Sequence, residues 1–438
     1  MTIQDFIDCN KHFCYIFLVY YKRYVEDKIK TALATSGVVV VKGPKFCGKT
    51  TTSRIFASSS YVLDTKAKIN LTQANPAAIL EGRKPRLIDE WQNVPDLWNV
   101  ARGYIDNCED KFGQLIFTGS TTPEDKESIY HSGAGRIVSI EMKTMSLYES
   151  EESKGTVSLS DLFSGICNVF ETNEDYSIRD TAFFICRGGW PLSVLAGRER
   201  ALKITANYIS TLFQFENSEN GKYRNLKKNT LVTMLKSYAR NISTEARRQV
   251  LINDISAHEG RNIDPDTFDK YREALKDLFI ISDIDAWNPN FRSKTTIVSS
   301  STLHFIDTSV AANALHVSPA DLMNDPETFG LFFEDFAVKE LSIYADYLNG
   351  EIRHYRDANG LECDAVIHLE DGRYGLVEIK LGGEKLVKYG ESRLLLLSEK
   401  IRKENKPEPA FMMVLTATGP AYKTEHGVYV IPVNLLKA

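Results

Sequence analysis

The sequence predicts an α/β fold divided into several domains, and three observations support this prediction. The chain has 438 residues, whereas a single hydrophobic core stops growing at roughly 250 to 300 residues. Between residues 37 and 143, short apolar runs alternate with amphipathic stretches, which is typical of parallel strands covered by helices. After residue 326 the pattern changes to a helix, three strands, a helix and further strands. We therefore expect an α/β domain at each end of the chain and a largely helical middle.

The first domain, residues 21–150, is predicted to contain a doubly wound parallel sheet. One helix is expected over Thr51–Ala57, directly after the first strand. Another is expected over Pro95–Asn107, where proline suits the first helical turn. The predicted strands are Val38–Lys42, Tyr61–Asp64, Arg86–Asp89, Gln114–Thr118 and Ile137–Glu141. This order of elements is that of a nucleotide-binding domain.

A phosphate-binding loop follows the first predicted strand. The run GPKFCGKT satisfies the pattern G-x-x-x-x-G-K-[ST] and lies between a strand and a helix, as the pattern requires. Its glycines let backbone N–H groups surround phosphates, and the helix N-terminus adds its positive dipole end. Lys49 is expected to reach the β- and γ-phosphates, and the Thr50 hydroxyl to ligate Mg²⁺. We expect ATP to bind at Gly43, Pro44, Lys45, Phe46, Cys47, Gly48, Lys49, Thr50 and Thr51.

Two adjacent carboxylates lie at the end of the predicted strand Arg86–Asp89. This strand is placed one strand further along than in the simplest P-loop arrangement. Asp89 is positioned to hold the Mg²⁺ shell, and Glu90 to polarise the water that attacks ATP. Since nucleotide binding alone needs no such base, Glu90 extends the prediction from ATP binding to ATP hydrolysis.

Two later features could complete this catalytic site. The strand that ends near residue 118 could place Thr118 or Ser120 between Asp89 and the γ-phosphate to orient water, although a strand end capped by a turn explains either hydroxyl equally well. Arg136 follows a glycine-containing loop and could stabilise transition-state charge, in its own subunit or in a neighbouring one. A surface salt bridge is the alternative interpretation of Arg136.

Four stretches of this sequence closely resemble an archaeal and bacterial family of AAA-type ATPases. They are residues 42–52, the run LIDEWQNVP at 87–95, the run FTGS at 117–120, and residues 135–149 with the run MSLYE. The resemblance covers nearly the whole chain from about Tyr21 onward. It implies an ATPase domain, a helical and winged-helix middle, and a C-terminal restriction-endonuclease-like domain. Where that family usually has an arginine in its P-loop, this chain has Lys45, which keeps the charge.

The middle of the chain is predicted to hold a helical connecting region, residues 151–220, and a winged-helix-like domain, residues 221–320. Two helical patterns, an apolar run at Leu278–Ile284 and a hairpin at Trp287–Val298 indicate the winged helix. The segment 222–248 is basic and could hold DNA phosphates without reading sequence. The helix near 266–278 is instead rich in acids that would repel phosphates, so a protein-docking or scaffolding role stays open. The basic residues are Lys222, Arg224, Lys227, Lys228, Lys236, Arg240, Arg247 and Arg248, against the single acid Glu245.

The C-terminal domain, residues 321–438, is predicted to follow the order αβββαβ. Turn residues at 358–360 and 371–372 are of the kind that join antiparallel strands. Helices are expected over Pro326–Leu348 and Glu384–Glu404. Strands are expected over Glu351–Arg356, Glu362–Glu370, Arg373–Lys380, Phe411–Thr416 and Val428–Val433.

Two of these strands carry the loose D-x(n)-E-x-K pattern of PD-(D/E)XK nucleases, formed by Asp364, Glu378 and Lys380. Alternation along a strand places Glu378 and Lys380 on the same side. The two carboxylates could bind a second Mg²⁺ or Mn²⁺, and Glu334 on the preceding helix could complete the metal site. Charged residues on an exposed strand face are the usual alternative, so the domain could keep the fold without the chemistry.

Two functions are compatible with these features. The first is a Mg²⁺-dependent ATPase that converts ATP to ADP and phosphate while acting on DNA, through the segment 222–248 and the nuclease-like domain. The second is a nucleotide-dependent switch or adaptor that binds a protein partner and has an inactive nuclease-like domain. A homo-oligomer is compatible with both.

Composition and cysteine usage limit the alternatives. The net charge of -5 provides no bulk attraction to nucleic acid, so DNA binding requires a local patch. The seven cysteines are scattered and form no C-x-x-C pair, which argues against a disulfide scaffold or a zinc finger. The one membrane-like stretch, Phe13–Tyr21, is too short to span roughly 30 Å of hydrocarbon. We therefore expect a cytoplasmic protein without a membrane partner.

Overall fold

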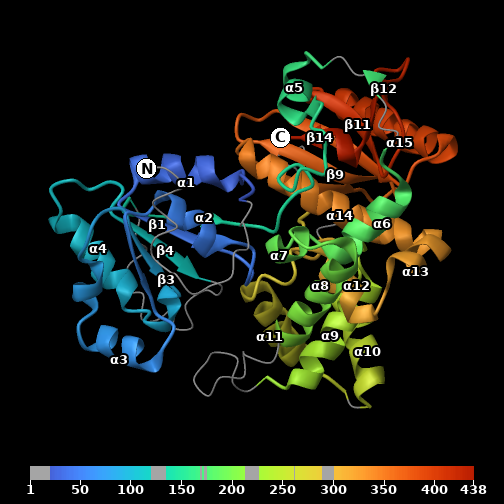
Figure 1. The fold of residues 1–438 in the computed structure, drawn as a ribbon. Coiled ribbons are helices and arrows are strands. Elements are labelled where there is room, and N and C mark those ends of the chain that lie inside the picture. The colour runs from blue at the N-terminus through green and yellow to red at the C-terminus, as the bar shows by residue number, and fades with distance from the viewer. Residues whose placement is uncertain are drawn as a thin grey trace.

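The computed structural model describes residues 20–119, 135–167, 170–171, 175–212, 226–260, 262–288 and 300–438. Figure 1 shows two bodies: the first domain lies to one side, and the middle helices and the C-terminal domain together form the larger second body. Most of the stretch Phe13–Tyr21 lies outside the described residues. Among the helices that are described, none combines the length and apolar character needed to cross a membrane.

The first domain contains a five-stranded parallel sheet in the order β2-β3-β4-β1-β5. β4 separates β1 from β3, which confirms that the strand bearing the paired carboxylates lies one place further along than in the simplest arrangement. Three strands have the predicted bounds, and β2 and β4 are shifted by two residues and one residue. The elements are α1 (Val25–Thr35), β1 (Val38–Lys42), α2 (Lys49–Phe56), β2 (Ser59–Val62), α3 (Lys66–Ala74), β3 (Arg86–Asp89), α4 (Leu97–Asn107), β4 (Leu115–Gly119) and β5 (Ile137–Glu141), with short 3-10 helices η2 (Pro76–Leu80) and η3 (Trp91–Asn93).

Both faces of this sheet are covered by helices. Val38 and Val40 of β1 pack in one core with residues of α4, and Val39 and Val41 pack in a second core with residues of α1. Successive side chains of a strand point to opposite faces, so a run of four valines buries both faces at once. The doubly wound architecture that the sequence predicts is therefore present.

The middle region is mainly helical, but it differs from the expected helix–helix–hairpin. Three helices, α9, α10 and α11, occur where two are predicted. The break between α9 and α10 is held by backbone hydrogen bonds that Ser243 and Thr244 exchange with Leu303, a distant contact that no local pattern reveals. The elements are β6 (Val157–Ser158), α5 (Leu159–Ser164), β7 (Phe170–Glu171), α6 (Ile178–Arg187), α7 (Pro191–Val194), α8 (Arg198–Leu212), α9 (Lys228–Arg240), α10 (Arg248–Glu259), α11 (Pro265–Asp277), α12 (Thr308–Leu315) and α13 (Pro319–Asn324).

Two isolated bridges flank the predicted hairpin Trp287–Val298. Isolated antiparallel bridges join Ile281 to Phe305 and Ile284 to Thr302, so the paired segments lie at both ends of the predicted hairpin Trp287–Val298. Residues 289–298 of that hairpin lie outside the described residues.

The C-terminal domain shows the expected order of one helix, three strands, a second helix and further strands. β10 pairs with β11 and β11 with β13 in parallel, whereas β8, β9 and β10 pair antiparallel. β7 from the middle region extends this sheet beyond β12, and β6 pairs with β14. The elements are α14 (Pro326–Tyr347), β8 (Gly350–Arg356), β9 (Glu362–Leu369), β10 (Tyr374–Lys380), α15 (Glu384–Lys403), β11 (Phe411–Thr416), β12 (Ala421–Lys423), β13 (Tyr429–Pro432), η4 (Val433–Leu435) and β14 (Leu436–Lys437).

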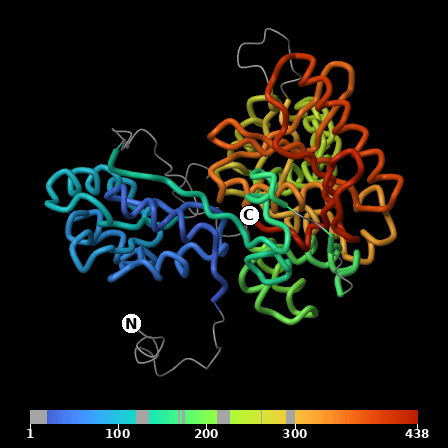
Figure 2. The backbone as a smooth tube through the Cα atoms, turned by 90° about the horizontal axis from the view of Figure 1, so that it is seen from above, coloured from blue at the N-terminus to red at the C-terminus, as the bar shows by residue number. Residues whose placement is uncertain are grey.

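A single hydrophobic core joins the middle helices to the C-terminal sheet, with the phenylalanines of α14 buried between them. The first domain has separate cores of its own. The chain passes from β5 into residues 143–153, which we call the strap. Figure 2 shows this part of the chain, in teal, running from the first domain to the second body. The strap therefore connects the two bodies, and Lys28 of α1 pairs with Asp346 of α14 (2.7 Å) across them.

Candidate active site

The P-loop is shaped by two glycines and by the end of β5. Gly43 and Gly48 have φ angles of 151° and 106°, values that side-chain-bearing residues rarely adopt. A Cβ on Gly43 would lie 2.1 Å from the carbonyl oxygen of Met142, so the loop can approach β5 only with glycine at this position. The Lys49 ammonium is buried and donates to the carbonyls of Gly43 (2.9 Å) and Pro44 (2.7 Å). The loop thus holds its lysine over its own backbone.

Asp89 is the centre of a compact set of oxygen atoms. The Thr50 hydroxyl donates to the Asp89 carboxylate and lies 3.0 Å from each of its oxygens. The Thr118 hydroxyl donates to Asp89 Oδ1 at 2.5 Å. Asp89 and Thr118 lie at the carboxyl ends of β3 and β4, and Thr50 opens α2 after the P-loop that follows β1, so all three meet at one edge of the sheet. The structure therefore unites Thr50, Asp89 and Thr118, which the sequence places far apart.

Glu90 follows Asp89 in the left-handed backbone region, with φ 58° and ψ 39°. Its carboxylate accepts a hydrogen bond of 2.5 Å from the side-chain amide of Gln92. Both Glu90 and the P-loop residues Lys49 and Thr50 line the same pocket. The unusual backbone angle turns Glu90 away from the strand, and Gln92 holds its carboxylate.

This pocket has a volume of about 900 Å³ and extends well beyond the P-loop. Its other wall comes from the segment before α1 and from α7 and α8 of the middle region. The Tyr208 hydroxyl donates to the carbonyl of Lys45 (3.0 Å), and its ring meets the exposed ring of Phe46 edge to face. The sequence did not predict this second wall, whose residues are Tyr20, Tyr21, Arg23, Pro191, Leu192, Leu195, Tyr208 and Thr211.

The two remaining residues that the sequence predicted for this site are Arg136 and Ser120. Arg136 precedes β5, which runs parallel to β1 with Ile137 opposite Val38 and Glu141 opposite Lys42. Arg136 therefore lies at the end of the sheet opposite the P-loop, where it pairs with Asp106 (2.9 Å). This placement corrects the suggestion that Arg136 acts on the nucleotide of its own subunit, because the strand separates the two. Ser120 lies outside the described residues.

The basic segment is partly neutralised by acids on neighbouring helices. Arg240 pairs with Asp254 (2.5 Å), and Arg248 pairs with Asp269 (2.5 Å). Lys227, Lys228 and Arg247 are exposed, whereas Lys222 and Arg224 lie outside the described residues. The excess of positive charge read from the sequence is therefore smaller on the folded surface.

The nuclease-like residues of the C-terminal domain do come together. The Lys380 ammonium lies 2.8 Å from Asp364 Oδ2 and 2.8 Å from Glu378 Oε2. Asp364 Oδ2 also accepts from the backbone N–H of Ile379 (2.7 Å). The other carboxylate oxygen of Glu378 is buried and has no hydrogen-bond partner in the described part of the chain. β9 and β10 thus bring all three side chains to one face, with lysine between the carboxylates.

The pKa directions in this cluster show that the carboxylates are crowded. Burial, and next the negative charge of Asp364, raise the pKa of Glu378 to about 8. The same two causes raise the pKa of Glu334, on the neighbouring helix α14, well above its usual value. Burial lowers the pKa of Lys380, but the charges of Asp364 and Glu378 raise it by more, so the pKa of Lys380 is raised overall. The cluster therefore favours protonated glutamates and a charged lysine.

A second metal is not supported by this arrangement. In the described ranges, no group of three or more histidine, cysteine, aspartate or glutamate side chains is placed to hold an ion. The Lys380 ammonium lies 2.8 Å from both Asp364 and Glu378, where a shared cation would have to lie. The expected Mg²⁺ or Mn²⁺ does not fit unless Lys380 moves.

Comparison with known proteins identifies the first domain. Residues 35–151 match the family model described as an AAA domain, so the chain contains an AAA-type ATPase domain with a P-loop. Residues 178–321 and 329–436 match models described as domains of unknown function, DUF8612 and DUF4143. The first of these spans both the predicted connecting region and the predicted winged-helix-like domain.

Several proteins are similar to this chain over most of its length. An uncharacterized protein of Mycobacterium tuberculosis, Rv2008c, is 23% identical over 365 residues, which cover 82% of this chain and 74% of that protein. The uncharacterized protein Mb2031c of Mycobacterium bovis shows the same values. Among solved structures, the Walker-type ATPase PABY2304 of Pyrococcus abyssi aligns with a TM-score of 0.42 and 14% identity, covering 68% of this chain and 96% of that chain.

Proposed function

We propose that this protein hydrolyses ATP to ADP and phosphate in a Mg²⁺-dependent reaction at the P-loop. The observation that carries the proposal is the meeting of Thr50, Asp89 and Thr118 beside Glu90 at the end of β1, β3 and β4. Binding alone would require the loop and its lysine. A second carboxylate, held by Gln92 and facing the same pocket, supports hydrolysis.

Each residue has a distinct part in the proposed reaction. Lys49 leaves the carbonyls of Gly43 and Pro44 to bind the β- and γ-phosphates, whose negative charge is the better partner for an ammonium. Glu90 accepts the proton of the attacking water, and Gln92 keeps the Glu90 carboxylate in place for this step. Thr118 orients Asp89 through its 2.5 Å hydrogen bond.

The oxygen set at Asp89 suits Mg²⁺. This ion takes one or two protein oxygens together with substrate phosphates and water, so it needs no all-protein cage. The Thr50 hydroxyl and the Asp89 carboxylate are such a pair, and their mutual distance of 3.0 Å is short enough for both to share one ion. When bound, Mg²⁺ would neutralise charge that develops on the phosphates.

Steady-state ATPase assays of the parent and of Lys49→Ala test this proposal. We expect Mg²⁺-dependent phosphate release from the parent, loss of that release in EDTA, and strongly weakened nucleotide binding in Lys49→Ala. Lys30→Ala, which changes an exposed lysine of α1, is the matched control and should behave as the parent. A parent that releases no phosphate under any divalent cation, or a Lys49→Ala variant as active as the parent, contradicts the proposal.

For the molecule on which the ATPase acts, we propose DNA. The support is the group of exposed basic residues at the start of α9 and α10, Lys227, Lys228 and Arg247, which can contact phosphates without reading sequence. ATPase rates with single-stranded and double-stranded DNA test this. Stimulation that falls with salt and disappears in a triple glutamate variant of these residues supports DNA. A rate indifferent to DNA favours the switch or adaptor that binds a protein partner.

We further propose that the C-terminal domain has a restriction-endonuclease-like architecture but binds DNA without cleaving it. The order α14-β8-β9-β10-α15-β11 and the grouping of Asp364, Glu378 and Lys380 support the architecture. The lysine between the carboxylates favours the inactive alternative. We expect no cleavage of DNA by the parent with Mg²⁺ or Mn²⁺. Metal-dependent cleavage that is lost in Asp364→Ala, Glu378→Ala and Lys380→Ala would instead establish an active nuclease.

A further inference from the structure

Arg23 joins the P-loop to the strap through three hydrogen bonds of its guanidinium group. Nη1 donates to the carbonyl of Cys47 (2.9 Å), Nε to the carboxylate of Glu149 (3.1 Å), and Nη2 to the carbonyl of Lys143 (2.8 Å). The side chains of Arg23 and Glu149 are only 5% and 3% exposed. A planar guanidinium engaged on all three nitrogens has one orientation, so Arg23 fixes the distance between loop and strap.

The contact with Cys47 bears on nucleotide binding through the geometry of the peptide bond. The carbonyl of Cys47 and the N–H of Gly48 belong to the same planar, trans peptide unit, so they point in opposite directions. Because Arg23 holds the carbonyl on one side, the Gly48 N–H must face the other. The guanidinium also packs behind Gly48, since a Cβ there would lie 3.5 Å from Arg23 Nη1. Backbone N–H groups of this loop are what bind phosphates.

Glu149 continues the connection into the strap. One of its oxygens pairs with Arg23 and accepts from the backbone N–H of Tyr24 (2.8 Å). Its other oxygen accepts from the backbone N–H of Ser146 (2.8 Å) and from the Ser146 hydroxyl (3.0 Å). A single buried carboxylate thus fixes the turn at Ser146 relative to Arg23.

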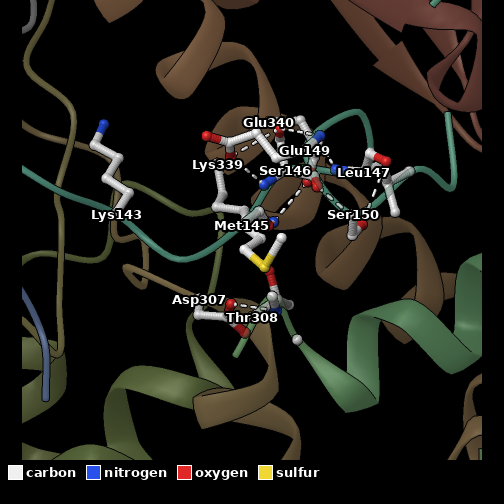
Figure 3. A network of polar contacts seen from close by, with 12 residues as sticks. Lys143, Met145, Ser146, Leu147, Glu149, Ser150, Asp307, Thr308, Lys339 and Glu340 are labelled. Carbon is white, nitrogen blue, oxygen red and sulfur yellow. Dashed lines mark hydrogen bonds and ion pairs between the residues drawn. The ribbon is translucent and has the colours of Figure 1, made fainter. Parts of the chain in front are cut away.

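The next residue of that turn contacts α14. The backbone N–H of Leu147 donates to Glu340 (2.8 Å), and Lys339 donates to the carbonyl of Met145 (2.8 Å). Figure 3 shows Lys339 and Glu340 beside Met145, Ser146 and Leu147 of the strap. Glu340 is fully buried, and it also accepts from Tyr344 (3.0 Å). α14 is the helix that carries Glu334 of the C-terminal cluster.

We propose that Arg23 is a positioning residue for nucleotide binding that couples the P-loop to α14 through Glu149 and the strap. The proposal rests on nucleotide binding at the P-loop, as proposed above. It adds α14 as the part of the chain that is coupled to this binding. Phosphates that bind the Gly48 N–H reinforce the orientation that Arg23 imposes on the Cys47–Gly48 peptide. Nucleotide therefore tightens the contacts of residues 143–150 with α14, and by linkage these contacts tighten nucleotide binding.

Equilibrium binding of a non-hydrolysable ATP analogue is the first test. We expect Arg23→Gln to bind it roughly tenfold more weakly, and Arg23→Lys to bind it more weakly than the parent, because one ammonium cannot span three acceptors. Arg187→Gln is the matched control. Arg187 is equally buried and pairs with Glu152 of the same strap, but its Nε donates to Gly188 rather than to the P-loop. It should keep the parental affinity even if its melting temperature falls.

Hydrogen exchange of residues 143–150, measured with and without nucleotide, is the second test. If Arg23 only stabilised the fold, its replacement would not change how these amides respond to nucleotide. We expect the analogue to protect these amides in the parent and in Arg187→Gln, and to leave them unchanged in Arg23→Gln and Arg23→Lys at saturating analogue. Parental affinity in both Arg23 variants, or analogue binding without added protection in the parent, overturns the proposal. A parent that binds no analogue at all would instead contradict the proposed function.

Discussion

At the scale of single residues, Glu90 depends on neighbours that carry no charge. Its left-handed backbone conformation costs of order 1–3 kcal/mol in a residue with a side chain, a cost that is typical of functional sites. The Gln92 amide that holds its carboxylate fits against Gly119, where a Cβ would lie 2.3 Å from Gln92 Oε1. Gly119 therefore provides the space that Gln92 needs beside Glu90.

Replacing Gly119 should reduce catalysis more than binding. In Gly119→Ala we expect Gln92 to be displaced and Glu90 to lose its hydrogen bond, so the ATPase turnover number falls while analogue affinity stays near that of the parent. Gly103→Ala is the control, because a Cβ there has nothing within 4 Å and alanine stabilises a helix interior by about 0.5–1 kcal/mol. Equal turnover numbers in both variants and the parent would show that Gln92 does not position Glu90.

The residues of the P-loop and the carboxylates of β3 could be predicted because their chemistry is written in short local patterns. Arg23 and Tyr208 could not. Tyr208 lies 163 residues from Lys45, whose carbonyl it contacts, and Arg23 precedes the motif by a whole helix and strand. Only the packing of distant segments brings such residues to the loop, and single tyrosines and arginines carry no positional signal of their own.

At the scale of elements, long periodic segments were predictable and short paired ones were not. The observed α14 ends one residue before its predicted end, and β11 has the predicted bounds. β6, β7, β12 and β14 have two or three residues each and were not predicted. Such strands form because a partner is available, as when Leu436 pairs with Val157, and not because of any intrinsic propensity.

β8 shows how one strand links the second body together. Its His354 accepts a backbone hydrogen bond from Trp287 (2.6 Å), and its Nε2 lies 2.9 Å from the carbonyl of Ser300. Burial lowers the pKa of His354 below its usual value of 6.5, although Ser300 and Glu245 oppose this. The folded protein therefore prefers the neutral imidazole at the junction between β8 and the middle region.

This pKa direction predicts a loss of stability in mild acid. At pH values well above the usual pKa, His354 is neutral in both the folded and the unfolded state, so the folded protein has its full stability. As pH falls through about 6.5, the unfolded state takes up a proton that the folded state resists, so stability is lost. We expect the melting temperature of the parent to fall relative to His354→Gln between pH about 7.5 and about 5.5. His426→Gln, at an exposed position, should follow the parent, and parallel curves for His354→Gln would refute the assignment.

At the scale of the whole molecule, an AAA-type ATPase domain is attached to a second body whose own core is continuous. The sequence predicted an ATPase domain, a helical middle region and a C-terminal domain. It did not predict that the middle helices and the C-terminal sheet share one hydrophobic core. That core depends on α14 lying between them, and hydrophobic periodicity shows only that a helix has buried faces, not what covers them. The strap has no helix or strand to predict, yet it contacts all three parts.

The central claim is that Glu90 is the base of an ATPase centred on Asp89, and one paired measurement on Glu90→Gln tests it most directly. Analogue affinity and ATP turnover should be measured on the same preparation, with Glu109→Gln, an exposed change in the same domain, as control. We expect parental affinity and a turnover number reduced by roughly 10²–10⁴-fold in Glu90→Gln, and parental values for both in the control. Hydrolysis by Glu90→Gln at the parental rate would contradict the account.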